Sequence, residues 1–223
     1  MLALDRSAMK KKISKKKAVL KKKTTKKKVA SAPKKKSATK AKKVIYRHWK
    51  KVSFREAVSH IIAALKTHDV DAVLIGEGAA ALYSTAIEVE HLALVIPVFH
   101  VEFMEGLLKK LSFRMGEVRH FTSSKSSFDI QFYSPPILLG DSRVSRCETI
   151  KTRIADIALL SATDSVRDRL AQWYRWGNRR ALEHALAVAR SQAVDFDAVA
   201  SWSADEGATD KFSEFELLLQ KGF

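Results

Sequence analysis

The sequence predicts an α+β protein: a mixed β-sheet with covering helices, followed by a C-terminal helical extension and preceded by a disordered N-terminal arm. Three observations indicate this organisation. Residues 1–43 are dominated by lysine, residues 44–160 alternate between helical and strand-like apolar patterns, and residues 161–223 carry the helical period. We expect three parts with these boundaries. The roughly 180 residues after the arm suffice for one domain with a helical extension.

The arm carries almost all of the net charge of the chain. Residues 1–43 contain eighteen lysines and Arg6 but a single acid, Asp5, whereas the remainder holds 22 Lys and Arg against 23 Asp and Glu. Like charges repel, and the arm has too few apolar residues to offset its ordering entropy, so we expect it to be disordered. Five lysine triplets supply most of the charge: Lys10, Lys11, Lys12, Lys15, Lys16, Lys17, Lys21, Lys22, Lys23, Lys26, Lys27, Lys28, Lys34, Lys35 and Lys36.

A polycation of this kind favours a polyanionic partner. Lysine lacks the bidentate fork of arginine, and the arm has no aromatic side chain to stack on bases, so it predicts sequence-independent binding to nucleic-acid phosphates. A solubilising tail, or an arm that contacts acidic lipid or protein, is the alternative. Leu2 excludes N-myristoylation, and the charges are not followed by the apolar segment of a secretory signal. Met9 is an alternative start to Met1.

The rest of the chain gives two indications of the cellular compartment. We find no apolar stretch long enough to span a membrane. The single cysteine, Cys147, cannot form an intrachain disulfide, which fits a reducing environment. We therefore predict a cytoplasmic protein, with association with the nucleoid through the arm as a further option. Cys147 lies in an alternating segment and is expected to be a packed strand residue.

Helix and strand patterns alternate through the core. Ser53-Phe54-Arg55-Glu56 has the form of a capping box, and apolar residues recur at helical spacing from there to His68. A buried strand over 71–75 ends in the turn Gly76-Glu77-Gly78, which a short helix over 79–84 follows. The other core segments are a strand over 91–98, a helix over 101–111, a strand over 128–133, and one or two strands within 144–150 and 153–160.

The pattern after Ser161 is helical. Thr163 or Asp164 is placed to cap a helix that runs to Trp176, where Gly177 breaks it. Three more helices are expected, over 179–192, after an Asp195 cap, and over 210–219.

Two features of this arrangement resemble the nucleotidyltransferase superfamily, which includes polymerase-beta-like enzymes and the antitoxin-type nucleotidyltransferases of bacteria. One is the strand, glycine turn, short helix and second strand around Gly76 and Gly78. The other is Asp168-Arg169-Leu170 with Trp176, Asn178 and Arg179, which is similar to a pattern in a bacterial group of uncharacterised nucleotidyltransferase-like proteins. The resemblance covers roughly residues 53–205. It implies a nucleotidyltransferase-like core in which Gly76 and Gly78 bind the nucleotide.

The resemblance also implies where a magnesium site belongs. In the superfamily the second strand begins with an Asp-x-Asp pair and a later strand supplies a third carboxylate, because two Mg²⁺ ions need several oxygen ligands. At the matching positions this chain has His91, Ala93 and Gln131, which are not carboxylates. The metal site is then lost, and Mg²⁺ is expected as a cofactor only if the enzyme is active. The acidic Glu77 is a further departure, because it would repel a triphosphate in the turn.

A shifted alignment leaves an active enzyme as an alternative. Glu88 and Glu90 have the spacing that puts two side chains on one face of a strand, and Asp129 lies on the same face as Gln131. These three acids would hold Mg²⁺. Their simpler interpretation is that Glu88 and Glu90 lie in a solvated loop and Asp129 at a strand start.

The motif residues of the helical region allow two interpretations. Asp168 and Arg169 either pair with Arg179 or Arg180 across a helix hairpin or contact substrate. We expect the aromatic residues of this region to pack in the fold rather than to stack on bases: Trp173, Tyr174 and Trp176. The chain has no Walker A loop, zinc-ligand cluster or Gly-x-Ser-x-Gly elbow, which argues against those enzyme classes.

Three functional hypotheses remain from the sequence. The first is a catalytically degenerate nucleotidyltransferase-like domain that binds nucleotide, RNA or a protein partner and is tethered to nucleic acid by the arm. The second is an active Mg²⁺-dependent nucleotidyltransferase that uses Glu88, Glu90 and Asp129. The third is an architectural nucleic-acid-binding protein whose folded body only packs or dimerises.

Overall fold

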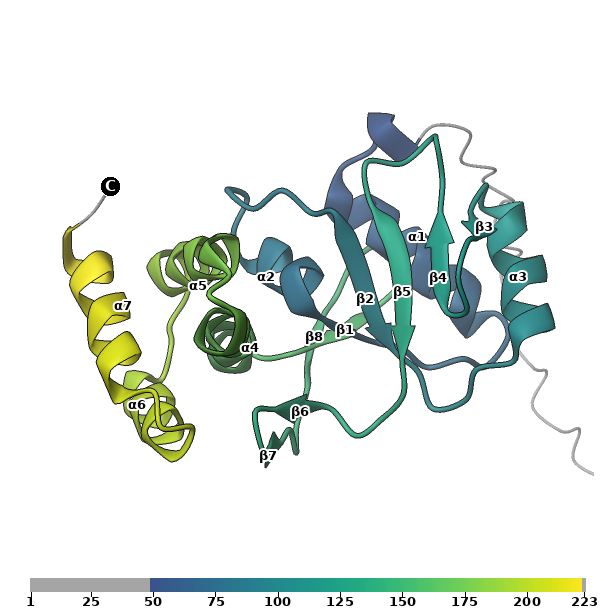
Figure 1. Cartoon of the computed structure of the whole chain (residues 1–223). Coiled ribbons are helices and arrows are strands. Elements are labelled where there is room, and N and C mark those ends of the chain that lie inside the picture. The colour runs from purple at the N-terminus through teal and green to yellow at the C-terminus, as the bar shows by residue number, and fades with distance from the viewer. Residues whose placement is uncertain (1–48, 222–223) are drawn as a thin grey trace, which may run out of the picture. The chain divides into compact units, whose positions relative to one another are not determined.

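The α+β class is confirmed by the computed structural model, which describes residues 49–221. The predicted arm and its lysine triplets lie outside the described residues. The described residues 49–221 belong to one compact unit. Within its described part, a mixed sheet carries covering helices and is followed by a C-terminal helical region (Figure 1).

A seven-stranded mixed sheet organises the described residues, in the order β3-β4-β5-β2-β1-β9-β8. β1 is antiparallel to β2 and parallel to β9, and β2 is parallel to β5. β6 and β7 form a separate small antiparallel sheet. The strands are β1 (Val73–Ile75), β2 (His91–Val95), β3 (Arg114–Met115), β4 (His120–Thr122), β5 (Asp129–Tyr133), β6 (Leu138–Leu139), β7 (Ser142–Arg143), β8 (Glu148–Ile150) and β9 (Ile157–Leu159).

The strands of the sheet centre agree with the sequence prediction, whereas the peripheral ones differ. β2 ends at Val95 and so does not reach Pro97, which has no N–H to contribute to a ladder. β3, β4, β6 and β7 have only two or three residues and were not predicted. The expectation for Cys147 was wrong, because this residue lies in the segment between β7 and β8 and is only partly buried.

The helices begin at side-chain caps. Ser53 accepts from the N–H of Glu56 as the capping box predicts, and Asp195 caps α6. α4 is capped by Ser161, not by Thr163 or Asp164, because the Ser161 hydroxyl accepts from the N–H of Asp164 at 3.0 Å. The helices are η1 (Trp49–Lys51), α1 (Phe54–Lys66), α2 (Gly76–Tyr83), α3 (Val101–Lys110), α4 (Ala162–Trp176), α5 (Arg179–Ser191), α6 (Phe196–Asp205) and α7 (Thr209–Lys221).

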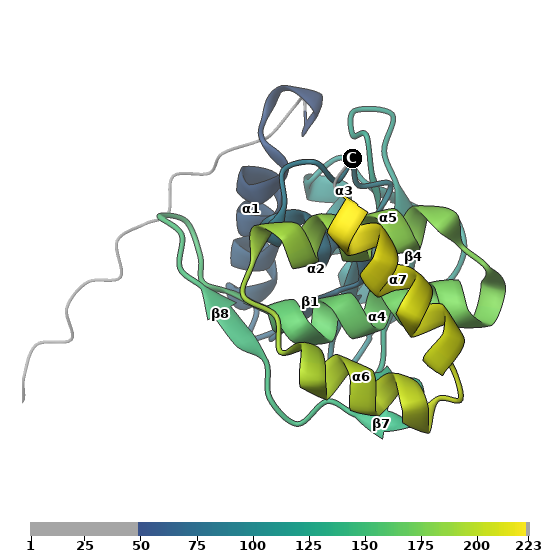
Figure 2. The ribbon, with the colours of Figure 1, turned by 90° about the vertical axis from the view of Figure 1, so that its left-hand side faces the viewer.

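Two hydrophobic cores hold these elements together. The first lies between the sheet and helices α1 and α3, and the second lies among α4 to α7. Figure 1 shows α4 to α7 on the side of the sheet opposite to α3, and Figure 2 looks onto them from that side. Ala80 and Ile87 belong to the second core although they precede β2. Helix α2 contacts β1, β2, α4 and α5, so it lies where the two cores meet.

Within residues 49–221, none of the helices combines the length and the apolar character that crossing a membrane would require.

Candidate functional site

The sequence predicts a turn over residues 76–78 before a helix over 79–84, but α2 already begins at Gly76, so these residues form its first turn directly after β1. The sequence predicts nucleotide binding here, and we call residues 76–78 the glycine corner. Gly76 has a φ of +69°, a left-handed conformation that favours glycine. A Cβ atom on Gly76 would lie 3.4 Å from the Cβ of Ala93 and 3.6 Å from Nη2 of Arg169. A methyl group on β2 and a guanidinium on α4 therefore line this corner.

Gly78 has a packing role that the sequence did not reveal. A Cβ atom added there would lie 3.0 Å from Cδ1 of Leu74 and 3.4 Å from Cδ1 of Leu92, both of which belong to the first core. The absence of a side chain at Gly78 lets α2 approach β1 and β2 closely. Close packing alone thus accounts for this glycine, and its predicted role in nucleotide binding stays a prediction.

Glu77, the acid within the corner, is engaged by backbone. It is 9% exposed, and its Oε1 accepts from the N–H groups of Glu90 and His91, both at 2.6 Å. These donors lie at the start of β2. The carboxylate thus joins the first turn of α2 to the strand where the resemblance places metal ligands. A buried carboxylate in this position adds negative charge to the corner, which a bound triphosphate would meet.

Asp129, at the start of β5, is held between two histidines. The parallel register places it beside His91, and Gln131 beside Ala93. Oδ1 of Asp129 lies 2.8 Å from Nδ1 of His91, and Oδ2 lies 2.5 Å from Nε2 of His120 on β4. Both oxygens of the carboxylate are therefore engaged with imidazole nitrogens. The sequence missed His120 as a partner, because a three-residue strand gives no periodic signal of its pairing.

Beyond Asp129, strand β5 carries two neutral polar side chains, Gln131 and Tyr133. The hydroxyl of Tyr133 donates to Oε1 of Gln131 at 2.8 Å. Burial raises the pKa of Tyr133, and the negative charges of Asp129 and Asp168 raise it further, against the opposing charge of Arg169. The phenol of Tyr133 thus stays protonated, and the charges of Asp129, Asp168 and Arg169 all influence its pKa.

The alternative metal set is not assembled. Oε1 of Glu90 pairs with Nη1 of Arg180 at 2.5 Å, and this hydrogen bond lowers the pKa of Glu90. Arg180 also donates to the backbone carbonyl of Glu88 at 2.8 Å. Among residues 49–221, no three His, Cys, Asp or Glu side chains are placed to hold one metal ion. Glu88, Glu90 and Asp129 therefore do not fit Mg²⁺, which needs several convergent oxygen ligands.

Arg169 forms its ion pair with its neighbour in the chain. Its Nε and Nη2 donate to Oδ2 of Asp168 at 3.0 and 2.7 Å. The predicted pairing of Asp168 across the helix hairpin is wrong, because Arg179 pairs with Glu214 and Arg180 with Glu90. The pair with Asp168 keeps the Arg169 guanidinium against Gly76.

The aromatic residues of α4 divide into two kinds. Trp173 is buried, and Tyr174 stacks on Trp202 with ring centroids 5.7 Å apart, so both pack as expected. Trp176 is 67% exposed, and the packing expected for it was wrong. As the last residue of α4 it lies beyond the second core.

His184 on α5 is a buried histidine that sequence reasoning did not place at the corner. Its Nδ1 has no hydrogen-bond partner within the described part of the chain. Burial lowers its pKa to about 4, and the charges of Arg169 and Arg180 add to this while Glu77 and Glu90 oppose it. The available signal was its place among the apolar positions of α5, which face the second core.

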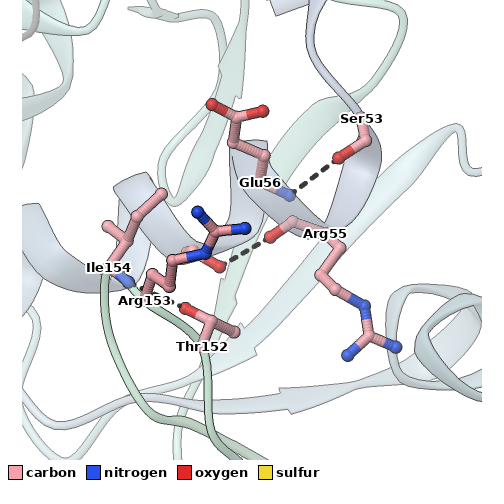
Figure 3. A pocket seen from close by; sticks show the side chains of 7 residues that line it. Ser53, Arg55, Glu56, Thr152, Arg153 and Ile154 are labelled. Atoms are coloured by element: carbon pink, nitrogen blue, oxygen red, sulfur yellow. Dashed lines mark hydrogen bonds between the residues drawn. The ribbon is translucent and has the colours of Figure 1, made fainter.

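A cavity of about 480 Å³ opens elsewhere, at the N-terminal end of α1 (Figure 3). Arg55, Glu56 and Arg153 contribute charged side chains to its wall. No residue of the glycine corner lines it. This cavity is therefore separate from the candidate site.

Comparisons with known proteins give a weak likeness. No protein-family model matches the chain, and no curated protein matches it. An antigenic nucleotidyltransferase-like protein from Paracoccidioides brasiliensis is 17% identical, with a TM-score of 0.46 over 60% of this chain and 74% of that one. The antibiotic-resistance factor ANT(2'')-Ia is 13% identical, with a TM-score of 0.46 over 76% of this chain and 97% of that one. We assign no property of either protein to this chain on that likeness.

Replacing Glu77 tests whether the corner is a structural joint. We expect Glu77→Ala to lower the free energy of unfolding by about 1–3 kcal/mol, because two backbone N–H groups lose their buried acceptor. Glu77→Gln keeps an oxygen acceptor and is expected to cost less. Urea denaturation of both variants measures the difference. Equal stability of Glu77→Ala and the native chain would contradict the assignment.

His184 predicts a pH dependence of stability. Since burial lowers its pKa to about 4 from an ordinary 6.5, the unfolded chain binds more protons between these values. We expect the free energy of unfolding to fall as the pH is lowered from 6.5 towards 4, with His184 contributing up to about 1.4 kcal/mol per pH unit. His184→Gln removes this part of the slope, whereas His100→Gln, a change at an exposed position, leaves it. Identical slopes in denaturation series of both variants would refute the role of His184.

Proposed function

We propose that the chain is a catalytically degenerate nucleotidyltransferase-like protein, tethered to nucleic acid by its lysine-rich arm. The nucleotidyltransferase part is supported by the resemblance around Gly76 and Asp168 and by the succession of β1, α2 with the glycine corner as its first turn, and β2. The tether is supported by the eighteen lysines of residues 1–43. In this proposal the folded part binds a nucleotide, RNA or a protein partner and transfers no nucleotide.

The observation that carries the loss of catalysis is the composition of the corner. Phosphoryl transfer by metal ions requires carboxylates that converge on the cations. In their place the corner has the methyl of Ala93 and the guanidinium of Arg169. The one acid of β5 in reach of β2, Asp129, already binds His91 and His120.

A fixed guanidinium also changes what the corner can bind. The guanidinium group of arginine is a cation in proteins, and that of Arg169 is paired with Asp168. Because Arg169 lies beside Gly76, the corner has a covalently attached cation in the place where the superfamily binds Mg²⁺ ions. We infer that the corner offers electrostatic binding of an anion at most, and that it lacks the means to activate a hydroxyl.

The arm supplies the contact with nucleic acid in this proposal. Neutralising phosphates with lysines releases condensed counterions, which is favourable and independent of base sequence. The near-neutral remainder of the chain gives no such general attraction, with 22 basic against 23 acidic residues. Binding therefore depends on the arm and on salt.

We expect the full-length chain to show no Mg²⁺-dependent incorporation of labelled nucleotide into tRNA, DNA or a co-expressed protein. The physical reason is the lack of convergent carboxylates within the described residues. A metal-dependent nucleotidyltransferase run in parallel controls the assay. Robust transfer by the chain, above its heat-inactivated sample, would contradict the proposal.

A second prediction concerns the arm alone. We expect replacement of the fifteen triplet lysines by glutamine to abolish binding of labelled DNA and RNA, whereas replacement by arginine retains it because the charge is kept. For the native chain, engagement of ~8 phosphates lowers affinity by roughly 10³–10⁵ between 50 and 200 mM salt. Fluorescence anisotropy measures both effects. Undiminished binding by the glutamine variant would overturn the tether.

A further inference from the structure

A second basic region lies on the folded part, far from the glycine corner in the sheet order. A cavity of about 450 Å³ lies among the end of α3, the strands β3 and β4, and the turn that follows β4. Three cationic side chains line it: Lys109, Arg114 and Lys125. No carboxylate belongs to its lining.

The three cations are available to a ligand. Each belongs to an exposed residue, and none of them forms an ion pair within the described part of the chain. The nearest acid along α3, Glu105, shares the lining of a neighbouring hollow with Lys109 and Arg114 but forms no ion pair with either of them. Lys109 also complements the C-terminal dipole of α3, but this accounts for one charge and not for three from separate elements.

The rest of the lining is suited to phosphate oxygens. Thr122, Ser123 and Ser124 bring hydroxyl groups that can donate hydrogen bonds. The aromatic residue of the lining, Phe113, is fully buried and packs in the first core. A base therefore has no exposed ring of this cavity to stack on, and the lining fits the sugar-phosphate backbone.

The first described residues, Trp49 and Lys50, lie beside this cavity. The indole N–H of Trp49 donates to the carbonyl of Leu111 at 2.7 Å, and its ring lies 5.9 Å from that of Phe113. The N–H of Lys50 donates to the carbonyl of Lys125 at 3.2 Å. Residues 44–48 alone separate this attachment from the arm.

We propose that the cavity of Lys109, Arg114 and Lys125 binds the phosphodiester backbone of a nucleic acid and continues the contact that the arm makes. The inference rests on the proposed function in that the arm delivers the nucleic acid to this surface. Arginine supplies a bidentate fork for one phosphate, and the lysines supply point charges for others. The cavity and the arm then contact the same nucleic acid.

The cavity at the start of α1 provides a useful contrast. It also has two arginines, Arg55 and Arg153, but the carboxylate of Glu56 and the apolar side chain of Ile154 share its wall (Figure 3). Arg55 donates to the carbonyl of Leu82 at 2.9 Å. Mixed charge and an engaged arginine make it less suited to a polyanion than the cavity beside Trp49.

The test compares two triple variants of the full-length protein. One is Lys109→Ala, Arg114→Ala and Lys125→Ala. The control removes three exposed cations that lie on β7, before β8 and at the end of α7: Arg143→Ala, Arg146→Ala and Lys221→Ala. Both lose the same charge, and both are expected to keep the native melting temperature because the side chains are exposed. The probe is a fluorescein-labelled DNA duplex of about 20 base pairs, titrated by anisotropy at several salt concentrations.

We expect the cavity variant to bind at least about tenfold more weakly at 100 mM salt and its log–log salt slope to fall by about 2–3, at about 0.9 per lost phosphate contact. The control is expected to retain the native slope. In lysine acetylation footprinting of the native chain, the duplex is expected to protect Lys109 and Lys125 but not Lys221.

The outcomes separate the two proposals. Equal losses in both triple variants, or no protection of Lys109 and Lys125, overturn the cavity as a binding surface while leaving the arm as the tether. Absence of duplex binding by the native chain overturns the tether and this inference together. Loss confined to the cavity variant, with protection, supports it.

Discussion

The buried carboxylate of Glu77 is the contact on which the arrangement of the candidate site depends. Its Oε1 accepts two short hydrogen bonds from the N–H groups that begin β2. Hydrogen bonds to a charged acceptor are stronger than neutral ones, and a buried carboxylate without them would be costly. The contact fixes the first turn of α2 against β2, and so brings Gly76, Ala93 and Arg169 together. The groups of the glycine corner are therefore held by contacts within the protein itself.

The charges around the corner are arranged in closed pairs. Arg169 binds Asp168, Arg180 binds Glu90, and Asp129 binds His91 and His120. Of the three acids in the alternative metal set, Glu90 and Asp129 are thus engaged by side chains of the protein. Three cations that form no ion pair within residues 49–221 lie together elsewhere, around the cavity of Lys109, Arg114 and Lys125. For this reason we propose that the arm and the cavity of Lys109, Arg114 and Lys125 bind anions. We also propose that the glycine corner does not catalyse metal-dependent transfer.

The sequence revealed features that depend on near neighbours. The caps at Ser53 and Asp195 and the central strands follow from residue type and spacing within a few positions. Strands of two or three residues, such as β3 and β6, are too short for an alternating pattern to be visible. The resemblance of the glycine turn and of Asp168 to a known superfamily suggested the position of the corner but not the partners of its side chains.

The partners of the site were beyond local reasoning for physical reasons. Glu77 bonds to backbone groups thirteen and fourteen residues away, and no side-chain pattern marks a backbone donor. Asp129 meets His91 across a parallel pairing whose register only the fold determines. Asp168 and Arg169 are adjacent, and adjacent residues of a helix do not normally face each other, so a partner one turn or one helix away was the natural expectation.

The central claim is that divalent cations have no carboxylate site at the glycine corner. Paramagnetic Mn²⁺, added with ATP to isotope-labelled full-length protein, tests it most directly, because it broadens the NMR signals of nearby amides. The account predicts that the amide signals of Gly76, His91 and Ala93 persist at Mn²⁺ concentrations that saturate a metal-dependent nucleotidyltransferase. Selective broadening of these three signals, reversed by excess Mg²⁺, would contradict it.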